Sequence, residues 1–459
     1  MQAAAGLQLT TSPGLRGWAG LAVLSLALAG VFALLLAVSR IPGVEDIELW
    51  PLDFFNKGLV IHVVFSFIVW FLSVFGAILS IATVRLGASS GSIEKILLVA
   101  AYASTVMLFA PSFMNTGEAT LNNYIPAITD PLYYAGLVTL GGSLGIMALR
   151  LMMAVSTSQG RWREPLCFGA LVAAFLYVLA LAEFIITGVS LAGDDFSYEF
   201  NEALFWGGGH TLQFVNVALL FIALGTLLSL STGGRHSVSG KSATTAYFVL
   251  AVTATVGLYI TVSYAPAHEL YWSLFTDLQY GMALPSLLFG FPLLMAFISV
   301  RNTDGHFPWR QPAFLCLALS PIVFGVGGIL GLFVDGADTR TPAHYHGVIA
   351  GINLSFMGLF YGLFLPLMGR DLKPSRAVNA QVWMFGGGQL LASIGLFMAG
   401  GYGTPRKTAG GAQNLSDLGA IVGMSLNGIG ALIAISGGVM FIWMIARALI
   451  RSPEQPAAT

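Results

Sequence analysis

Twelve long apolar segments separated by short polar loops constrain this chain more than any other feature. Each segment is long enough to cross about 30 Å of hydrocarbon as a helix, which rises about 1.5 Å per residue. Only 9% of the 459 residues are charged, whereas soluble domains carry about 25%. The sequence therefore predicts an all-α membrane protein, with helices at 17–39, 58–84, 94–114, 131–153, 165–190, 201–230, 243–265, 275–299, 311–334, 343–369, 379–401 and 417–446.

The basic residues of the loops predict how these helices are oriented. If the N-terminus is cytoplasmic, fifteen of the twenty Lys and Arg residues face the cytoplasm, as the positive-inside rule requires. The five outer ones are Arg40, Lys57, Arg340, Arg406 and Lys407. We expect a multi-pass protein of a prokaryotic inner (plasma) membrane, in which residues 17–450 form one twelve-helix domain. The cytoplasmic tails would be 1–16 and 451–459.

Five of the seven histidines fall at the outer ends of predicted helices, and the other two lie in polar loops. The five are His62, His210, His268, His344 and His346. An imidazole in a bilayer is costly unless something compensates it, and several converging histidines most often bind a metal or a heme iron. A single buried histidine is more often satisfied by a backbone carbonyl, but five at a common depth favour ligands.

Short motifs surround these histidines. Residues 204–210 contain the pattern W-x-x-G-H, and residues 342–346 contain H-Y-H. Residues 403–407 read G-T-P-R-K, and residues 123–126 read N-Y-I-P shortly before two tyrosines. In their order and their helices, these motifs resemble the catalytic subunit I of heme-copper oxidases, with the N-Y-I-P region similar to the B-type branch.

This resemblance implies two hemes and one non-heme metal, copper or iron. It implies that His62 and His346 hold a low-spin heme and that His344 is the proximal ligand of a high-spin heme. The non-heme metal would lie at His210 and His268. Two side chains in an H-x-H step diverge by about 200° on a helix, which suits two hemes better than one shared metal.

The resemblance also gives the turn at 403–407 a role. The family's basic pair at this turn binds heme propionates, so Arg406 and Lys407 are the candidate partners here. Charge-assisted pairing with two carboxylates suits such a pair. The alternative is an ordinary cationic turn at the outer surface.

Two positions depart from the family. The family carries two adjacent histidines at its seventh helix. This chain has Ala267 at the first of these positions and keeps only His268. Glu269 is a candidate third ligand, and oxygen ligands shift preference toward harder ions such as iron. The alternative for Glu269 is a solvated carboxylate at the membrane surface.

The second departure concerns a tyrosine. Most oxygen-reducing members place one four residues after the helix-six histidine, where this chain has Phe214. Oxygen reduction needs four electrons, one of them from that tyrosine, whereas nitric oxide reduction needs two for each pair of NO molecules. Tyr264, four residues before His268, is a candidate substitute. Glu269 and Tyr264 are thus the candidate catalytic residues.

The leading hypothesis is reduction of nitric oxide to nitrous oxide, and the alternative is a cytochrome c oxidase-type reduction of oxygen to water. A second alternative is a non-enzymatic heme membrane protein, against which the proximal His344 argues.

The chain has no C-x-x-C-H motif and no copper–thiolate pattern. We therefore expect a subunit II-like partner, a cupredoxin or a c-type cytochrome, and a soluble donor such as cytochrome c. Nothing favours nucleic acid.

Two further carboxyl groups fall in the predicted helices. Glu183 lies inside 165–190. It is either a proton-relay carboxyl or the acceptor of an inter-helix hydrogen bond, since both roles are common for polar groups in membranes. Glu202 lies eight residues before His210, and we expect it at the outer surface.

Overall fold

The computed structural model describes residues 12–39, 54–88, 91–238, 240–334, 336, 338–408 and 410–452. Twelve spans of the described chain are long and apolar enough to cross a membrane, so the twelve-helix prediction is confirmed. The largest difference is the eighth span, which runs from Glu269 to Asp304 rather than 275–299. It begins earlier because a short helix continues through a 3₁₀ turn into the main one.

The chain divides into two compact units, which are described separately. Unit 1 comprises Met1–Ser25 and Val63–Phe307, and unit 2 comprises Leu26–His62 and Pro308–Thr459. The first two spans contribute to both units: α1 (Leu15–Ser39), and α2 (Phe55–Val63), which continues through the π-helix η4 (Val64–Val69) into α3 (Trp70–Arg85). The single domain at 17–450 stays a prediction.

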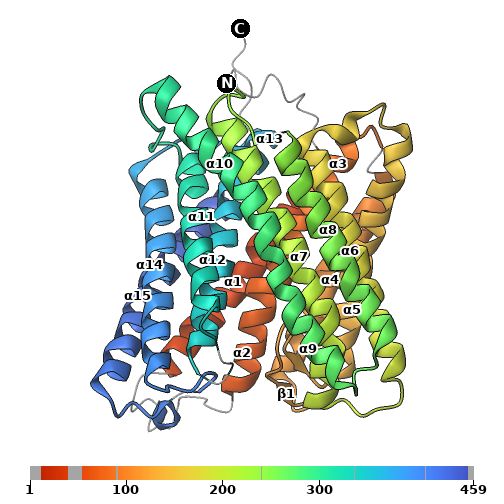
Figure 1. The fold of residues 1–459 in the computed structure, drawn as a ribbon, viewed down its shortest axis with the longest axis vertical. Coiled ribbons are helices and arrows are strands. Elements are labelled where there is room, and N and C mark those ends of the chain that lie inside the picture. Colours follow the sequence, from red (N-terminus) through yellow and green to blue (C-terminus); the bar gives the residue numbers. More distant parts are fainter. Residues whose placement is uncertain are drawn as a thin grey trace. The chain divides into compact units, whose positions relative to one another are not determined.

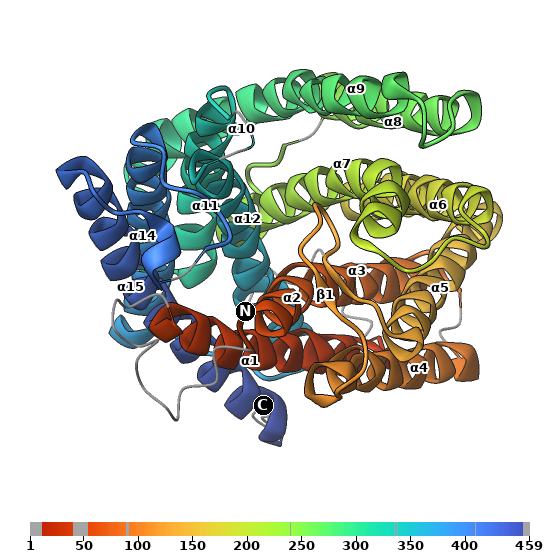
Figure 2. The same cartoon turned by 90° about the horizontal axis from the view of Figure 1, so that it is seen from below.

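Unit 1 holds six further spans and one small hairpin. Its elements are α4 (Gly91–Phe109), η5 (Ala110–Phe113), β1 (Ala119–Thr120), β2 (Ala127–Ile128), α5 (Pro131–Met153), η6 (Ala154–Thr157), η7 (Arg161–Arg163), α6 (Pro165–Ser190), α7 (Tyr198–Ser231), α8 (Lys241–Ser263), α9 (Glu269–Leu278), η8 (Gln279–Met282) and α10 (Ala283–Asp304). The two strands pair antiparallel, with Ala119 opposite Ile128. The hairpin lies beside α7 and is bonded to it (Figure 2).

Unit 2 holds four further spans. Its elements are α11 (Pro312–Gly331), α12 (Arg340–Leu359), η9 (Phe360–Phe364), α13 (Leu365–Leu367), α14 (Arg376–Gly401), η10 (Gly410–Gln413) and α15 (Leu418–Ile450). The π-helix η9 joins α12 to α13 within one continuous span. Helices α14 and α15 lie side by side along their lengths (Figure 1).

Glycine allows the helices of unit 2 to approach closely. A side chain added at Gly347 of α12 would come within 2.6 Å of the Gly327 backbone on α11. Membrane helices commonly use small residues in this way, because tight packing replaces the hydrophobic effect that lipid does not supply. The close contact fixes α12, which carries two of the predicted heme ligands, against α11.

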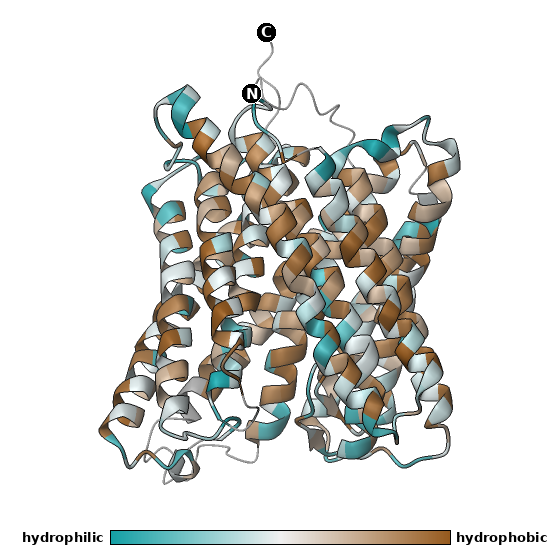
Figure 3. Cartoon of the chain, in the orientation of Figure 1, coloured by the Kyte–Doolittle hydropathy of each residue, from teal (hydrophilic) through white to brown (hydrophobic). Residues whose placement is uncertain are grey.

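Polar residues are concentrated in the loops and are sparse within the helices. Hydrophobic residues cover most of the length of the helices, and hydrophilic residues gather in the connecting loops (Figure 3). A few buried polar side chains interrupt the apolar spans, among them Glu183, Asn201 and His210. A buried polar group needs a partner, so these positions mark where the structure departs from simple apolar packing.

Candidate functional site

His344 lies in the first turns of α12, beside the end of α11. Its Nδ1 lies 2.8 Å from the backbone oxygen of Gly327. A carbonyl only accepts, so Nδ1 carries the proton and the neutral ring has its lone pair on Nε2. Gly331 leaves room for the ring, since an added Cβ would meet Nδ1 at 2.5 Å. Metal-bound histidines are usually oriented by this kind of hydrogen bond.

His62 has a matching arrangement on α2. Its Nδ1 lies 3.1 Å from the backbone oxygen of Ala29 on α1, so its lone pair is also on Nε2. The π-helix η4 begins two residues later, and π-helical turns often occur at functional sites. His346 stands two residues after His344 on α12, and its ring stacks on Tyr345 at 5.2 Å. All three predicted heme ligands belong to unit 2.

The basic turn at 403–407 is bonded to the start of the same helix. The backbone N–H of Thr339 donates to the oxygen of Thr404 at 3.0 Å, and Asp338 forms a bridge with Pro405. Arg340 lies in this region as well and pairs with Asp338. The turn that carries Arg406 and Lys407 is therefore held next to the N-terminus of α12, which puts positive charge where the resemblance implies heme propionates.

The residues of unit 2 fit heme. His62 and His344 each present an imidazole whose Nδ1 is already bonded to a backbone carbonyl. In addition, the hydroxyls of Thr341 and Thr404 are buried without a hydrogen-bond partner. Buried hydroxyls normally have a partner, and a propionate at this turn would supply one. The assignment of His62, His344, His346, Arg406 and Lys407 stays a prediction.

His210 lies on α7 and is 2% exposed. Its Nδ1 is 2.8 Å from the backbone oxygen of Trp206, one turn earlier. Its Nε2 is 2.7 Å from the hydroxyl of Tyr124. Since Nδ1 donates to the carbonyl, Nε2 of the neutral ring accepts from the Tyr124 O–H. Both ring nitrogens of His210 are therefore bonded.

Tyr124 comes from the loop between β1 and β2, far from His210 in the sequence. Its ring lies 4.4 Å from the His210 ring and 5.7 Å from that of Trp206. Burial raises the pKa of the Tyr124 hydroxyl well above its usual range, and the nearby carboxylate of Glu202 raises it further. The phenol thus stays protonated and acts as a hydrogen-bond donor.

The three glycines before His210 each make room for a different neighbour. A Cβ at Gly207 would approach the Tyr271 hydroxyl, one at Gly208 the ring of Phe184, and one at Gly209 the Cβ of Tyr124, all within 2.7 Å. The motif therefore lets three elements pack directly on the α7 backbone. The glycine of W-x-x-G-H is the one that admits Tyr124.

His268, Glu269 and Tyr264 lie together at the turn between α8 and α9. The exposed ring of His268 caps α9, because its Nδ1 accepts from the backbone N–H of Leu270 at 3.1 Å. Glu269 is the exposed first residue of α9, where a negative charge suits the helix dipole. The Tyr264 ring lies 5.3 Å from His268. His268 and Glu269 therefore both stabilise the N-terminus of α9.

Aromatic side chains connect this turn to α7. The ring of Trp272 lies 4.9 Å from Trp206, and that of Phe275 lies 5.4 Å from His210. Tyr264 packs against the same cluster. The structure thus brings the surroundings of His268 and of His210 into one aromatic cluster of unit 1.

The residues predicted to hold the non-heme metal do not fit one as they stand. Within the described ranges, no three His, Cys, Asp or Glu side chains lie close enough together to hold a metal ion. Both nitrogens of His210 and the Nδ1 lone pair of His268 are already used in hydrogen bonds. Imidazole by itself suits both copper and iron. The metal set His210, His268 and Glu269 stays a prediction.

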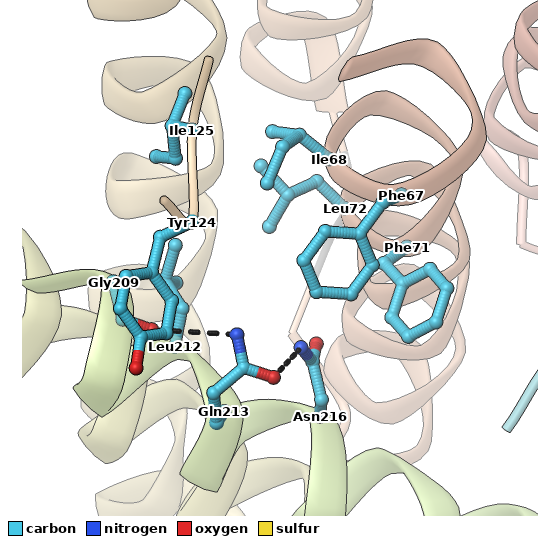
Figure 4. A pocket seen from close by; sticks show the side chains of 10 residues that line it. All are labelled: Phe67, Ile68, Phe71, Leu72, Tyr124, Ile125, Gly209, Leu212, Gln213 and Asn216. Carbon is cyan, nitrogen blue, oxygen red and sulfur yellow. Dashed lines mark hydrogen bonds between the residues drawn. The ribbon is translucent and has the colours of Figure 1, made fainter. Parts of the chain in front are cut away.

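A pocket opens beside Tyr124 (Figure 4). It lies between the η4–α3 span, the hairpin loop and α7. Its walls are apolar except for Tyr124, Gln213 and Asn216, and the two amides lie 3.4 Å apart. Such a lining suits a small uncharged molecule better than an ion.

Glu183 is fully buried on α6 and accepts from the Thr211 hydroxyl of α7 at 3.0 Å. The predicted inter-helix hydrogen bond is therefore present. Its second carboxyl oxygen, Oε2, has no partner within the structure. The proton-relay role of Glu183 stays a prediction.

Comparison with known proteins identifies the family of the chain. Residues 16–433 match the family described as Cytochrome C and Quinol oxidase polypeptide I. The chain belongs to the heme-copper oxidase subunit I family. Its fold also matches a heme-copper terminal oxidase dimer solved by cryo-electron microscopy, with a TM-score of 0.80 and 18% identity over 97% of this chain and 86% of that one.

Individual relatives agree with this family membership. An uncharacterized protein of Aquifex aeolicus is 30% identical over 77% of this chain and 84% of its own length. The uncharacterized protein RP382 of Rickettsia prowazekii is 24% identical over 94% and 95%. Cytochrome c oxidase subunit 1 of Thermus thermophilus is 25% identical over 55% and 49%. The chain is thus a multi-pass membrane member of the subunit I family, and the branch is not assigned by these relatives.

Sequence reasoning missed two residues of the His210 site. Tyr124 was noted only as part of a family-like segment, and Glu202 was expected at the outer surface. The structure shows the Glu202 carboxylate bonded to the loop that carries Tyr124, and the outer-surface position of Glu202 stays a prediction. The one available signal was Gly209, because a glycine next to a buried histidine often marks a close approach by another segment.

Proposed function

We propose that this subunit I reduces nitric oxide to nitrous oxide. The observation that carries the proposal is Phe214, which is fully buried one turn after His210. Oxygen-reducing members of the family place a tyrosine at this position. Two molecules of NO, two electrons and two protons give nitrous oxide and water, so the demand for electrons is half that of oxygen reduction. Loss of a side chain that supplies an electron is therefore better tolerated.

The heme ligands are the part of the chain that would support this reaction. Heme iron, when bound, supplies one-electron transfer and a coordination position for the substrate. His62 and His346 would hold the low-spin heme and His344 the high-spin heme. The backbone oxygens of Ala29 and Gly327 orient two of these rings, and Arg406 and Lys407 would balance the propionates.

The pocket beside Tyr124 supports a small uncharged substrate. Its apolar walls admit nitric oxide or oxygen without desolvating a charge. The amides of Gln213 and Asn216 are its main polar groups besides the phenol. We propose that this pocket lies on the route by which the gas reaches the interior of unit 1.

A second candidate function, reduction of oxygen to water, is favoured by a specific contact. The Tyr124 hydroxyl bonds to His210 Nε2 at 2.7 Å. A phenol is therefore present at this histidine, although it comes from another element than the family's own tyrosine. Tyr264 is a further candidate, but its neighbour is His268 rather than His210.

Electrons must reach the hemes from another protein in this proposal. The sequence has no C-x-x-C-H motif for covalent heme. We propose a subunit II-like partner with a cupredoxin or c-type cytochrome domain, and cytochrome c as the soluble donor. The complex would lie in the inner (plasma) membrane of a prokaryote.

The test is turnover of the purified, reduced complex with nitric oxide and with oxygen, each followed with a gas-specific electrode. Fast NO consumption with slow oxygen uptake is the expected result. Fast oxygen uptake would establish the second function instead. No turnover of either gas by protein that retains two hemes would contradict both and favour a non-enzymatic heme protein.

A further inference from the structure

We propose that Tyr124 is the positioning residue of His210, delivered to it by the β1–β2 hairpin in place of the tyrosine that the family carries on the histidine's own helix. The inference rests on the proposed function only in placing His210 at the reaction site. Four observations carry it: the contact itself, a left-handed backbone at Tyr124, the attachment of the loop to α7, and the gap at Gly209.

The contact fixes the His210 ring at both ends. Nδ1 donates to the Trp206 carbonyl at 2.8 Å, and Nε2 accepts from the Tyr124 hydroxyl at 2.7 Å. A ring held only by Trp206 could still tilt about that bond. With both nitrogens engaged, one tautomer and one ring orientation are selected.

The backbone at Tyr124 is held in an uncommon conformation. Its φ is +61°, which is unfavourable for a residue with a bulky side chain unless the surroundings impose it. Such conformations concentrate at functional sites. The left-handed turn is what directs the Tyr124 ring from the end of the hairpin toward α7.

The segment just before Tyr124 is attached to α7 at two points. The Glu202 carboxylate accepts from the backbone N–H of Asn123 at 2.8 Å and from its side-chain amide. One residue earlier on α7, Asn201 donates to the hydroxyl of Thr120 at 2.9 Å. These bonds come from the start of α7, more than two turns before His210, so the helix that carries the histidine also holds the loop that contacts it.

Gly209 leaves the space that Tyr124 needs beside α7. An ideal Cβ at this position would lie 2.6 Å from both Cβ and Cγ of Tyr124, which is closer than two such atoms can approach. Any other residue would displace Tyr124 from His210. The W-x-x-G-H motif in this chain therefore includes the space that the tyrosine occupies.

The experiment compares Tyr124→Phe with Tyr134→Phe in the full-length complex. Both substitutions remove a hydroxyl of this region, but Tyr134 donates to Asn201 at 2.9 Å and not to His210. The probe is solid-state NMR of protein with ¹⁵N-labelled histidine rings, reduced under carbon monoxide to limit paramagnetic broadening. His210→Gln identifies the signal of His210 among the seven histidines.

We expect wild-type His210 to show a protonated Nδ1 and a hydrogen-bonded, unprotonated Nε2. Tyr124→Phe should shift the Nε2 signal toward that of an unbonded ring nitrogen. It should also lower gas turnover by up to about 100-fold, because misplaced groups at a reaction site cost that much. Tyr134→Phe should leave the signal in place. An Nε2 signal that is the same in Tyr124→Phe and wild type would overturn the proposal, whatever the turnover.

The experiments distinguish a failure of the proposed function from a failure of the positioning role of Tyr124. If neither gas is consumed but Tyr124→Phe still shifts the His210 signal, the proposed function falls and the positioning role stands. If gas is consumed equally by wild type and Tyr124→Phe, and the signal does not move, the positioning role falls and the function stands.

Discussion

The histidines of the two units are held in different ways. In unit 2, His62 and His344 each use Nδ1 to bond a backbone oxygen of a neighbouring helix. In unit 1, His210 bonds the carbonyl of its own helix through Nδ1 and a tyrosine through Nε2. The first arrangement orients each ring from a neighbouring helix, and the second orients the ring from its own helix and from a loop tyrosine.

This difference suggests that the two parts of the family's site have changed to different extents. Heme ligation needs only one well-oriented nitrogen from each axial histidine, and backbone oxygens of unit 2 orient the rings of His62 and His344. A non-heme metal needs several ligands at one point, and Ala267 and the cap formed by His268 leave fewer of them. The comparison predicts that substitutions in unit 2 affect heme content, and that substitutions around His210 affect turnover while heme content is retained.

The largest effect is expected from His344→Ala. Removing the proximal imidazole should release the high-spin heme, so heme per chain falls from two to one, and gas turnover is lost. The measurement is the pyridine hemochrome assay together with optical spectra of the reduced protein. His306→Ala, at an exposed loop position, serves as the control and should keep both hemes. Full heme content in His344→Ala would show that unit 2 does not ligate heme through this residue.

The next effect is expected from Gly209→Ala. The added methyl group should displace Tyr124, lower gas turnover by about 10–100-fold and destabilise the protein by about 1–3 kcal/mol through overpacking. Heme content should not change. Gly142→Ala is the matched control, because it lies in a helix of unit 1 with no atom within 4 Å of the added Cβ. Turnover and thermal denaturation of Gly209→Ala equal to the control would rule out the close approach.

The helices were predictable from the sequence for a simple physical reason. A membrane helix needs about 20 apolar residues, and that requirement can be read locally, so all twelve spans were found. The eighth span began earlier than predicted because α9 is amphipathic and carries Glu269 and Asp277. Polar residues at a helix end lower the hydropathy without preventing the helix.

The contacts of His210 could not be predicted from the local sequence. The histidine and its motif are local, but Tyr124 reaches it only through a left-handed residue and a hairpin fixed by Glu202. Neither the positive φ of a tyrosine nor a contact between residues so far apart follows from hydropathy or spacing. For the same reason the bond between the Glu202 carboxylate and this loop could not be predicted.

The smallest effect is expected from Arg406→Gln, and it tests the unit 2 side of the comparison. Arg406 is half-buried in the turn bonded to the start of α12. A partly exposed ion pair contributes about 1 kcal/mol or less, so heme should dissociate at most about fivefold faster. The midpoint potential should also fall, because a propionate without its cation favours ferric iron. Redox titration measures the shift, and Lys373→Gln, at an exposed position of the same unit, should cause none. Equal potentials in Arg406→Gln and the control would mean that the turn is an ordinary cationic loop, and that only the histidines of unit 2 hold the hemes.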